Sequence, residues 1–254
     1  MSDFFKFMFE IPAGEQAEGT CFEKPIIFPC KADDLDNLFA FLFHRAWKDP
    51  VYRSKEELIS LGTLAQMWDM SDALQFVTKN LDWNLDFTGP ERLYYAQKFG
   101  VPKWAEKSVR YVLTSLNGAG GMEASSAGRL AVSIVVLLME GEANLIRFKK
   151  DLARDIPPLP KASKCPDHSR CEKALLKGWN RVIHPAISKH QGPLWEVTSI
   201  VEEHSFSDMS LECAKALHGK VKEAVGQIEG FVCAEAGKRV ENWLKSQLPS
   251  SDEK

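Results

Sequence analysis

The chain has 254 residues, of which 44% are hydrophobic and 26% are charged, and its formal net charge is -3. This length can bury a substantial core without a disulfide or a metal, and these ordinary fractions exclude wholesale disorder. The near-neutral charge lacks the basic surplus with which a dedicated nucleic-acid binder releases phosphate counterions, so nucleic acid is disfavoured as a partner.

The N-terminal residues, MSDFFKFMFE, contain an acid at Asp3 and no basic region ahead of the apolar stretch, unlike a secretory signal peptide. The most apolar window, residues 130–139, is far shorter than the ~20 residues of a membrane span. The six cysteines are irregularly spaced, unlike a secreted disulfide framework. We therefore expect an intracellular protein, cytoplasmic or nuclear, that has no membrane partner.

One short strand is predicted near the N-terminus, at residues 25–29. Ile26 and Ile27 are β-branched, and prolines stand on both sides of the segment. Because proline removes a backbone hydrogen-bond donor, this pattern is typical of an edge strand.

The rest of the chain after Lys31 has apolar residues at helical spacing. Ser54 and Glu57 predict a capping box at the start of one helix, and Gly100 predicts the left-handed residue that ends another. The predicted helices cover residues 35–46, 54–68, 71–81, 88–99, 102–116, 129–154, 171–187, 194–203 and 207–228. A separate final helix is expected to carry Val240, Trp243 and Leu244.

Residues 8–104 resemble the BTB (POZ-type) proteins that are numerous in basidiomycete fungi. The matching pieces, in chain order, are Met8-Phe9-Glu10-Ile11-Pro12, Lys24-Pro25-Ile26-Ile27-Phe28, Leu35-Asp36-Asn37-Leu38-Phe39-Ala40-Phe41-Leu42, Leu64-Ala65-Gln66-Met67-Trp68-Asp69-Met70 and Tyr94-Tyr95-Ala96-Gln97-Lys98-Phe99-Gly100-Val101-Pro102-Lys103-Trp104. Each piece is mainly a packing pattern, and their order and spacing make the match specific. The resemblance implies an α/β interaction domain followed by helices. It also implies that the family's N-terminal β-hairpin and first helix, which form its usual dimer face, are missing here.

The predicted fold class is therefore mainly α, with a partial BTB-like α/β module of one or few strands followed by helical regions. Four parts are expected along the chain. Residues 1–83 form the partial BTB-like domain, and residues 84–155 form a helical extension. Residues 156–164 are a Pro-rich linker, since Ile156-Pro157-Pro158-Leu159-Pro160 cannot continue a helix. Residues 165–254 form a C-terminal helical domain.

The most suggestive chemistry lies at Cys165, His168 and Cys171, which follow one another at three-residue intervals. Thiolate and imidazole are the ligands that structural zinc prefers, and a tetrahedral site needs a fourth. Cys213 is the best candidate for the fourth ligand. The less favoured candidates are His184, His218 and Cys233. The family resemblance implies a second ligand pair at Ser210 and Cys213, with serine at one expected ligand position. The alternative is that these cysteines are unliganded thiols near a helix start.

We expect a protein-binding adaptor or scaffold of the BTB-like kind, without catalytic activity and with no cofactor apart from a structural zinc. The sequence has no Gly-x-Ser-x-Gly elbow, and the glycines at 118–121 lack the Lys-Ser/Thr of a phosphate loop. Phe4, Phe7 and Ile27 are the expected contacts with a protein partner, and homo-oligomerisation is left open. The alternative function is a structural zinc-binding helical protein that binds a partner or nucleic acid through its C-terminal domain.

Overall fold

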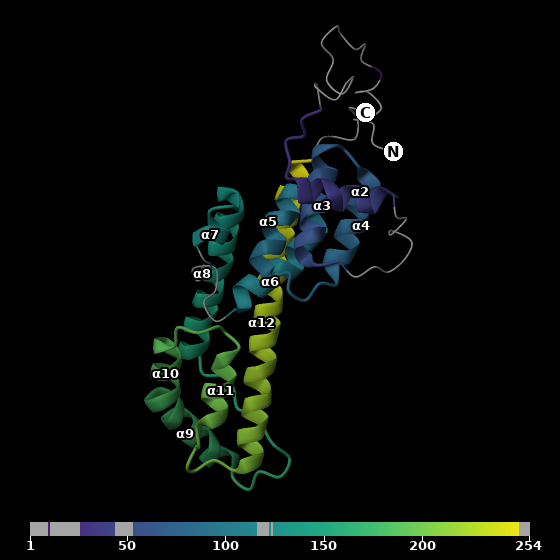
Figure 1. Ribbon diagram of the computed structural model, residues 1–254. Helices are drawn as coiled ribbons and strands as arrows, with labels where there is room; N and C mark the ends of the chain where they lie inside the picture. The colour runs from purple at the N-terminus through teal and green to yellow at the C-terminus, as the bar shows by residue number, and fades with distance from the viewer. Residues whose placement is uncertain (1–9, 11–25, 44–52, 116–121, 123, 249–254) are drawn as a thin grey trace. The chain divides into compact units, whose positions relative to one another are not determined.

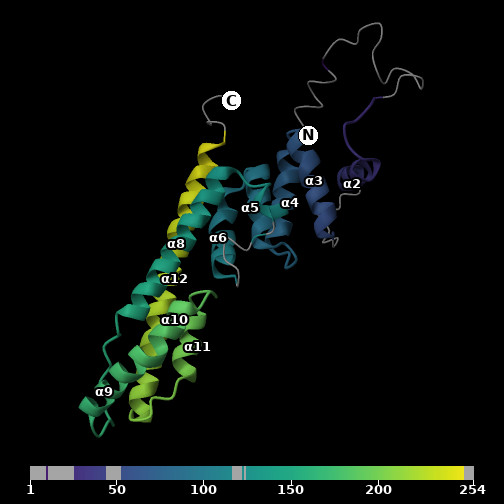
Figure 2. The same ribbon diagram turned by 90° about the vertical axis from the view of Figure 1, so that its left-hand side faces the viewer.

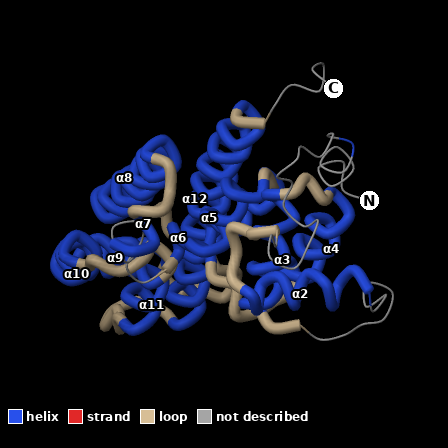
Figure 3. The backbone as a smooth tube through the Cα atoms, turned by 45° about the horizontal axis from the view of Figure 1, so that its top comes forward, coloured by secondary structure: helices blue, strands red, loops and turns tan. Residues whose placement is uncertain are grey.

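The computed structural model describes residues 10, 26–43, 53–115, 122 and 124–248. Over these residues the chain is mainly α, as predicted, and none of them lies in a β-strand (Figure 3). No helix in this part of the chain is both long enough and apolar enough to cross a bilayer. The chain divides into two compact units, Met1–Thr88 and Gly89–Lys254.

The first unit is built around α3, which packs against both α2 and α4 (Figure 1). The bounds of these helices are α2 Ala32–Phe43, α3 Lys55–Met67 and α4 Ser71–Asp82. The predicted capping box is present at the start of α3. The Glu57 backbone N–H donates to Ser54 Oγ at 3.1 Å, and the Ser54 N–H donates to Glu57 Oε2 at 2.8 Å. Two donors that the helix itself cannot satisfy are therefore paired.

The predicted edge strand at residues 25–29 is not formed over its described residues. Ile26, Ile27 and Phe28 lie in irregular backbone that leads into α2. A strand needs a neighbouring strand to pair with its backbone, and the described residues supply none. Instead, the Phe28 ring packs edge-on against Trp68 with ring centroids 5.6 Å apart. The apolar side chain therefore joins a helical core rather than a sheet.

The second unit is organised along its longest helix, α12 (Leu211–Ser246), which packs against α6, α8 and α11 (Figure 2). α6 lies beside the C-terminal half of α12 and packs against α5, whereas α9, α10 and α11 lie toward the N-terminal half of α12 (Figure 1). The remaining bounds are α5 Gly89–Phe99, η1 Pro102–Trp104, α6 Ala105–Thr114, α7 Ala124–Ala127, α8 Val132–Arg154, α9 His168–Gly178, the π-helical turn η2 Trp179–Ile183, α10 His184–Lys189 and α11 Glu196–Glu203. Gly100 follows α5 with a φ of 65°, as its predicted role at a helix end requires.

The extent of α12 differs from the sequence-based expectation. A break after Ile228 and a separate final helix are predicted, but the structure has one continuous helix of 36 residues. Val225 and Val232, on either side of the expected break, are both buried. The apolar stripe therefore continues through the glycines near residue 228, and its packing holds the helix together.

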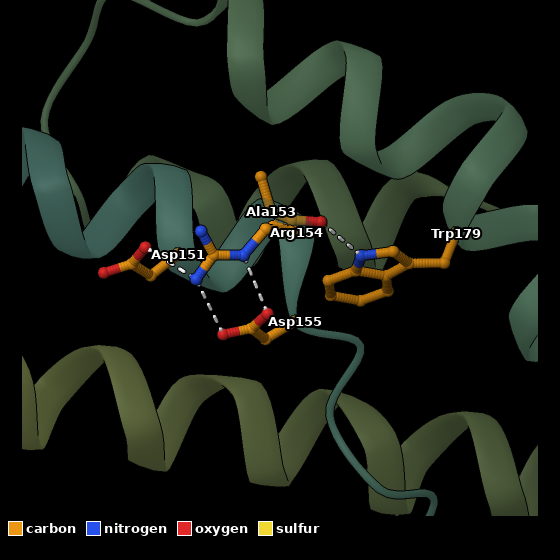
Figure 4. Close-up of polar contacts among 5 residues, drawn as sticks. All are labelled: Asp151, Ala153, Arg154, Asp155 and Trp179. Atoms are coloured by element: carbon orange, nitrogen blue, oxygen red, sulfur yellow. Dashed lines mark hydrogen bonds and ion pairs between the residues drawn. The ribbon is translucent and has the colours of Figure 1, made fainter.

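The Pro-rich segment, residues 156–164, lies inside the second unit, and the boundary between the two units falls between Thr88 and Gly89. Trp179, which is fully buried, ties the end of α8 to η2, because its Nε1 donates to the Ala153 carbonyl at 2.8 Å (Figure 4). That carbonyl belongs to the last turn of α8, where the helix itself provides no donor. On the other side of the same turn, Arg154 pairs with Asp151 and Asp155. The chain thus returns to the end of α8 after α9, at η2.

Candidate metal centre

Three cysteines and one histidine meet where α9 and α12 begin. Cys165 lies in the loop ahead of α9, His168 is the first residue of α9, and Cys171 follows one turn later. Cys213 lies in the first turn of α12. Residues three apart on a helix share a face, so His168 and Cys171 point to the same side of α9.

Local capping places both helix starts. The Asp167 side chain caps α9 by accepting from the Arg170 N–H at 3.0 Å. Ser210 caps α12 by accepting from the Cys213 N–H at 3.3 Å. An ion pair of 2.8 Å between Arg170 and Asp208 then links the two helix starts at the surface. The N-terminal ends of two helices therefore lie close to the cysteines.

The ligand atoms lie at the separations that a metal site requires. The Sγ atoms of Cys165 and Cys171 are 3.6 Å apart, and Cys213 Sγ is 4.0 Å from His168 Nδ1. The ligand atoms of Cys165, His168 and Cys213 all lie within 4.8 Å of one another.

A tetrahedron around zinc has comparable dimensions. With zinc–sulfur bonds of ~2.3 Å and zinc–nitrogen bonds of ~2.0 Å, two sulfur ligands stand about 3.8 Å apart, and a sulfur and a nitrogen about 3.5 Å apart. The observed 3.6 Å and 4.0 Å separations differ from these edges by only a few tenths of an ångström. These two separations are therefore compatible with zinc ligation, and Cys171 would have to move closer to the group formed by Cys165, His168 and Cys213.

Neighbouring polar groups hold two of the ligands in place. His168 directs Nδ1 at Cys213, while its Nε2 lies 3.4 Å from Glu172 Oε1. A carboxylate at the far ring nitrogen is the arrangement that fixes the tautomer of metal-binding histidines. The Ser210 N–H donates to Cys171 Sγ at 3.3 Å, and the Ser210 hydroxyl lies 3.7 Å from the same sulfur. Ser210 thus supports a neighbouring ligand.

The thiols differ in acidity. Burial favours a high pKa for Cys171, but its hydrogen bonds with Ser210 and with the Cys165 and Cys213 thiols outweigh burial and bring the pKa below its ordinary value. The pKa of Cys165 is raised, first by burial and then by its hydrogen bonds with the other two thiols. Of these two cysteines, Cys171 therefore more readily forms a thiolate. A cation that binds here would displace the remaining protons, because only thiolates ligate metals strongly.

Of the four predicted metal ligands, the structure groups Cys165, His168 and Cys213, while Cys171 lies beside this group with its Sγ 3.6 Å from that of Cys165. The reserve candidates His184, His218 and Cys233 do not belong to the described group of ligand atoms. Of the expected partner contacts, Phe4 and Phe7 lie outside the described residues, and the side chain of Ile27 is 78% exposed.

One supporting residue escaped prediction, and Ser210, which the resemblance places at a ligand position, has a supporting contact instead. Glu172 stands four residues after His168, so the helical spacing could have indicated a shared face. The Ser210 contact with Cys171 joins residues 39 apart in sequence, and only the packing of α9 near α12 brings them together.

No protein-family model, no curated protein and no solved structure matches the chain. The BTB-like resemblance of residues 8–104 therefore stays a prediction, and the site has to be interpreted from its own geometry.

Proposed function

We propose that this protein is a non-catalytic helical scaffold whose second unit is held by a structural zinc ion at Cys165, His168, Cys171 and Cys213. One observation carries the proposal: the ligand atoms of Cys165, His168 and Cys213 lie within 4.8 Å of one another, with Cys171 Sγ 3.6 Å from Cys165 Sγ, although His168 and Cys213 are 45 residues apart in sequence. Four protein ligands fill the coordination shell of zinc. That leaves no position for a reactive water, so the ion would have a structural role.

The ion would fasten the start of α12 to the start of α9. Apart from the cysteines, the polar link between these two helix starts is the exposed Arg170–Asp208 pair, and exposed pairs contribute little to stability. Zinc bound by the folded state alone adds its binding free energy to folding. Free thiols for this purpose persist in a reducing compartment, which favours the cytoplasm or the nucleus.

The test is the metal content of the purified full-length chain. We expect about one zinc ion per chain, measured by plasma mass spectrometry, and a competing chromogenic chelator should reveal tight binding. Cys213→Ser should reduce zinc to background and lower the midpoint of thermal unfolding.

The matched control is Cys233→Ala, which alters another buried cysteine of α12 and should leave zinc unchanged. Background zinc in the purified chain, with no uptake when zinc is added to the reduced protein, would reject the proposal.

A second, compatible role is protein binding by the first unit, as the BTB-like resemblance implies. Its strongly exposed apolar side chains include Ile27 at 78%, Trp83 at 82% and Leu85 at 99%. Trp83 and Leu85 lie in the turn after α4, between Asp82 and Asp86. Exposed tryptophan is a frequent anchor of protein interfaces. Because Asp82 and Asp86 flank these side chains, the site favours a partner with an apolar pocket that is surrounded by basic residues.

This role can be tested with a photo-crosslinking amino acid at position 85 and, as a control, at exposed Lys79 on α4. Position 85 should give one discrete protein adduct in cells, and Trp83→Ser should abolish it. An adduct of twice the chain's mass would identify a second copy as the partner. Identical patterns from positions 79 and 85 would reject the assignment.

A further inference from the structure

Two of the candidate zinc ligands have sulfur atoms in contact with each other. The Sγ atoms of Cys165 and Cys171 are 3.6 Å apart, whereas a disulfide bond is ~2.05 Å long. Cys165 belongs to a loop, and Cys171 belongs to α9. The loop sulfur can therefore close the difference without a rearrangement of the helix.

The two thiols differ in their access to solvent. Cys165 is partly exposed, whereas Cys171 and Cys213 are buried. A small oxidant in solution therefore meets Cys165 first. Cys171 Sγ, 3.6 Å from Cys165 Sγ, is then within reach of a product formed on Cys165.

We propose that the zinc centre is a thiol redox switch, in which a peroxide converts Cys165 and Cys171 into a disulfide and so releases the zinc ion. This inference rests on the proposed zinc site and adds regulation to it. The site then has two exclusive states, because a sulfur that has entered a disulfide no longer carries the negative charge that binds zinc.

The chemistry balances with hydrogen peroxide as oxidant. The Cys165 thiolate attacks one peroxide oxygen, the O–O bond breaks, hydroxide leaves, and Cys165 becomes a sulfenic acid. The Cys171 thiolate then attacks that sulfur, so the S–S bond forms as the S–O bond breaks and a second hydroxide leaves. The two hydroxides balance the charge of the Zn²⁺ ion that leaves the thiolates. The thiolate pair loses two electrons, peroxide gains them, and Zn²⁺ departs.

Oxidation would loosen one particular junction. Cys165 and Cys171 both stand on the α9 side, so their disulfide is local and makes no link to α12. Cys213 and His168, 4.0 Å apart, would lose the ion between them. The switch would thus free the start of α12 from α9 while leaving each helix capped by Asp167 or Ser210.

The experiment uses the full-length, zinc-loaded chain, with its zinc content measured first. One equivalent of hydrogen peroxide is added, released zinc is followed with a chromogenic chelator, and disulfides are mapped by peptide mass spectrometry. We expect about one zinc released per disulfide formed, a Cys165–Cys171 linkage, and recovery of zinc binding after a thiol reductant. Cys233 is buried on α12 and should stay reduced, which makes it an internal control.

A matched variant is Cys165→His, which offers zinc another nitrogen ligand but cannot form the disulfide. If it loads zinc, it should keep the metal under the same peroxide dose. For the wild-type chain, zinc that stays bound under peroxide, or zinc released with a different linkage, would overturn the switch and leave the zinc proposal standing. A wild-type chain that never loads zinc would reject both.

Discussion

Glu229 is a half-buried acid on α12, and its Oε2 atom has no hydrogen-bond partner among the described residues. Burial raises the pKa of this carboxyl, more than the positive charge of Arg110 lowers it. The folded protein therefore holds the Glu229 proton more tightly than the unfolded chain does. The stability from this preference is present at low pH and is lost as the pH rises through the folded-state pKa.

Glu229→Gln should consequently raise the midpoint of thermal unfolding at about pH 7.5, because the variant buries no ionised carboxylate there. The gain should shrink toward zero near about pH 4.5, where the wild-type side chain binds its proton. Differential scanning calorimetry at both pH values measures this. Glu223→Gln, which alters an exposed acid of the same helix, should show no comparable gain. An equal gain at both pH values would contradict the burial argument.

The glycines of α12 differ in what surrounds them. A Cβ atom added at Gly219, Gly226 or Gly230 would meet nothing within 4 Å. At Gly237 it would lie 2.8 Å from the Cα of Glu106 on α6, and backbone atoms cannot move aside as a side chain can. Gly237 is therefore required by close helix packing, whereas the other three only weaken the helix through their backbone freedom.

Gly226→Ala should stabilise the protein by up to about 1 kcal/mol, the difference in helix propensity between the two residues. Gly237→Ala should destabilise it by roughly 1–3 kcal/mol, as overpacking of an interior does. Both variants carry a Gly→Ala change in the same helix. Chemical denaturation of each one measures its free energy of unfolding, and the two changes can be compared. If both shift stability in the same direction, α12 and α6 do not pack as closely as described.

At the scale of the whole molecule, the structure has two units, each with its own buried residues. The candidate metal centre belongs to the second unit alone. Loss of the ion should therefore first promote local unfolding where α9 and α12 begin, because the free energy of local unfolding differs between regions of one protein.

Removing zinc with a chelator should raise amide hydrogen exchange across α9 and the first turns of α12, while α3 and α4 keep their protection. Hydrogen-exchange mass spectrometry of the full chain, with and without chelator, measures this pattern. Cys213→Ser should show the raised exchange before any chelator is added. Loss of protection spread evenly over both units would contradict a local structural role for the ion.

Most of the fold could be predicted where the signal is local. The capping box of Ser54 and Glu57 and the left-handed Gly100 depend on residues a few positions apart, and both are present as predicted. The residue types of the candidate site, and the spacing of His168 and Cys171, follow from the sequence in the same way. Glu172 could have been included by the same helical spacing.

By itself, the sequence determined where helices form, how several of them begin and end, and which side chains could ligate zinc. Only the tertiary structure decided that Phe28 packs on Trp68 instead of entering a sheet, that α12 continues through its glycines, and that Ser210 supports Cys171. The physical reason is the range of the interactions. Capping and helical periodicity act within a few residues, whereas strand pairing, helix packing and the convergence of Cys213 on His168 depend on segments far apart in the chain.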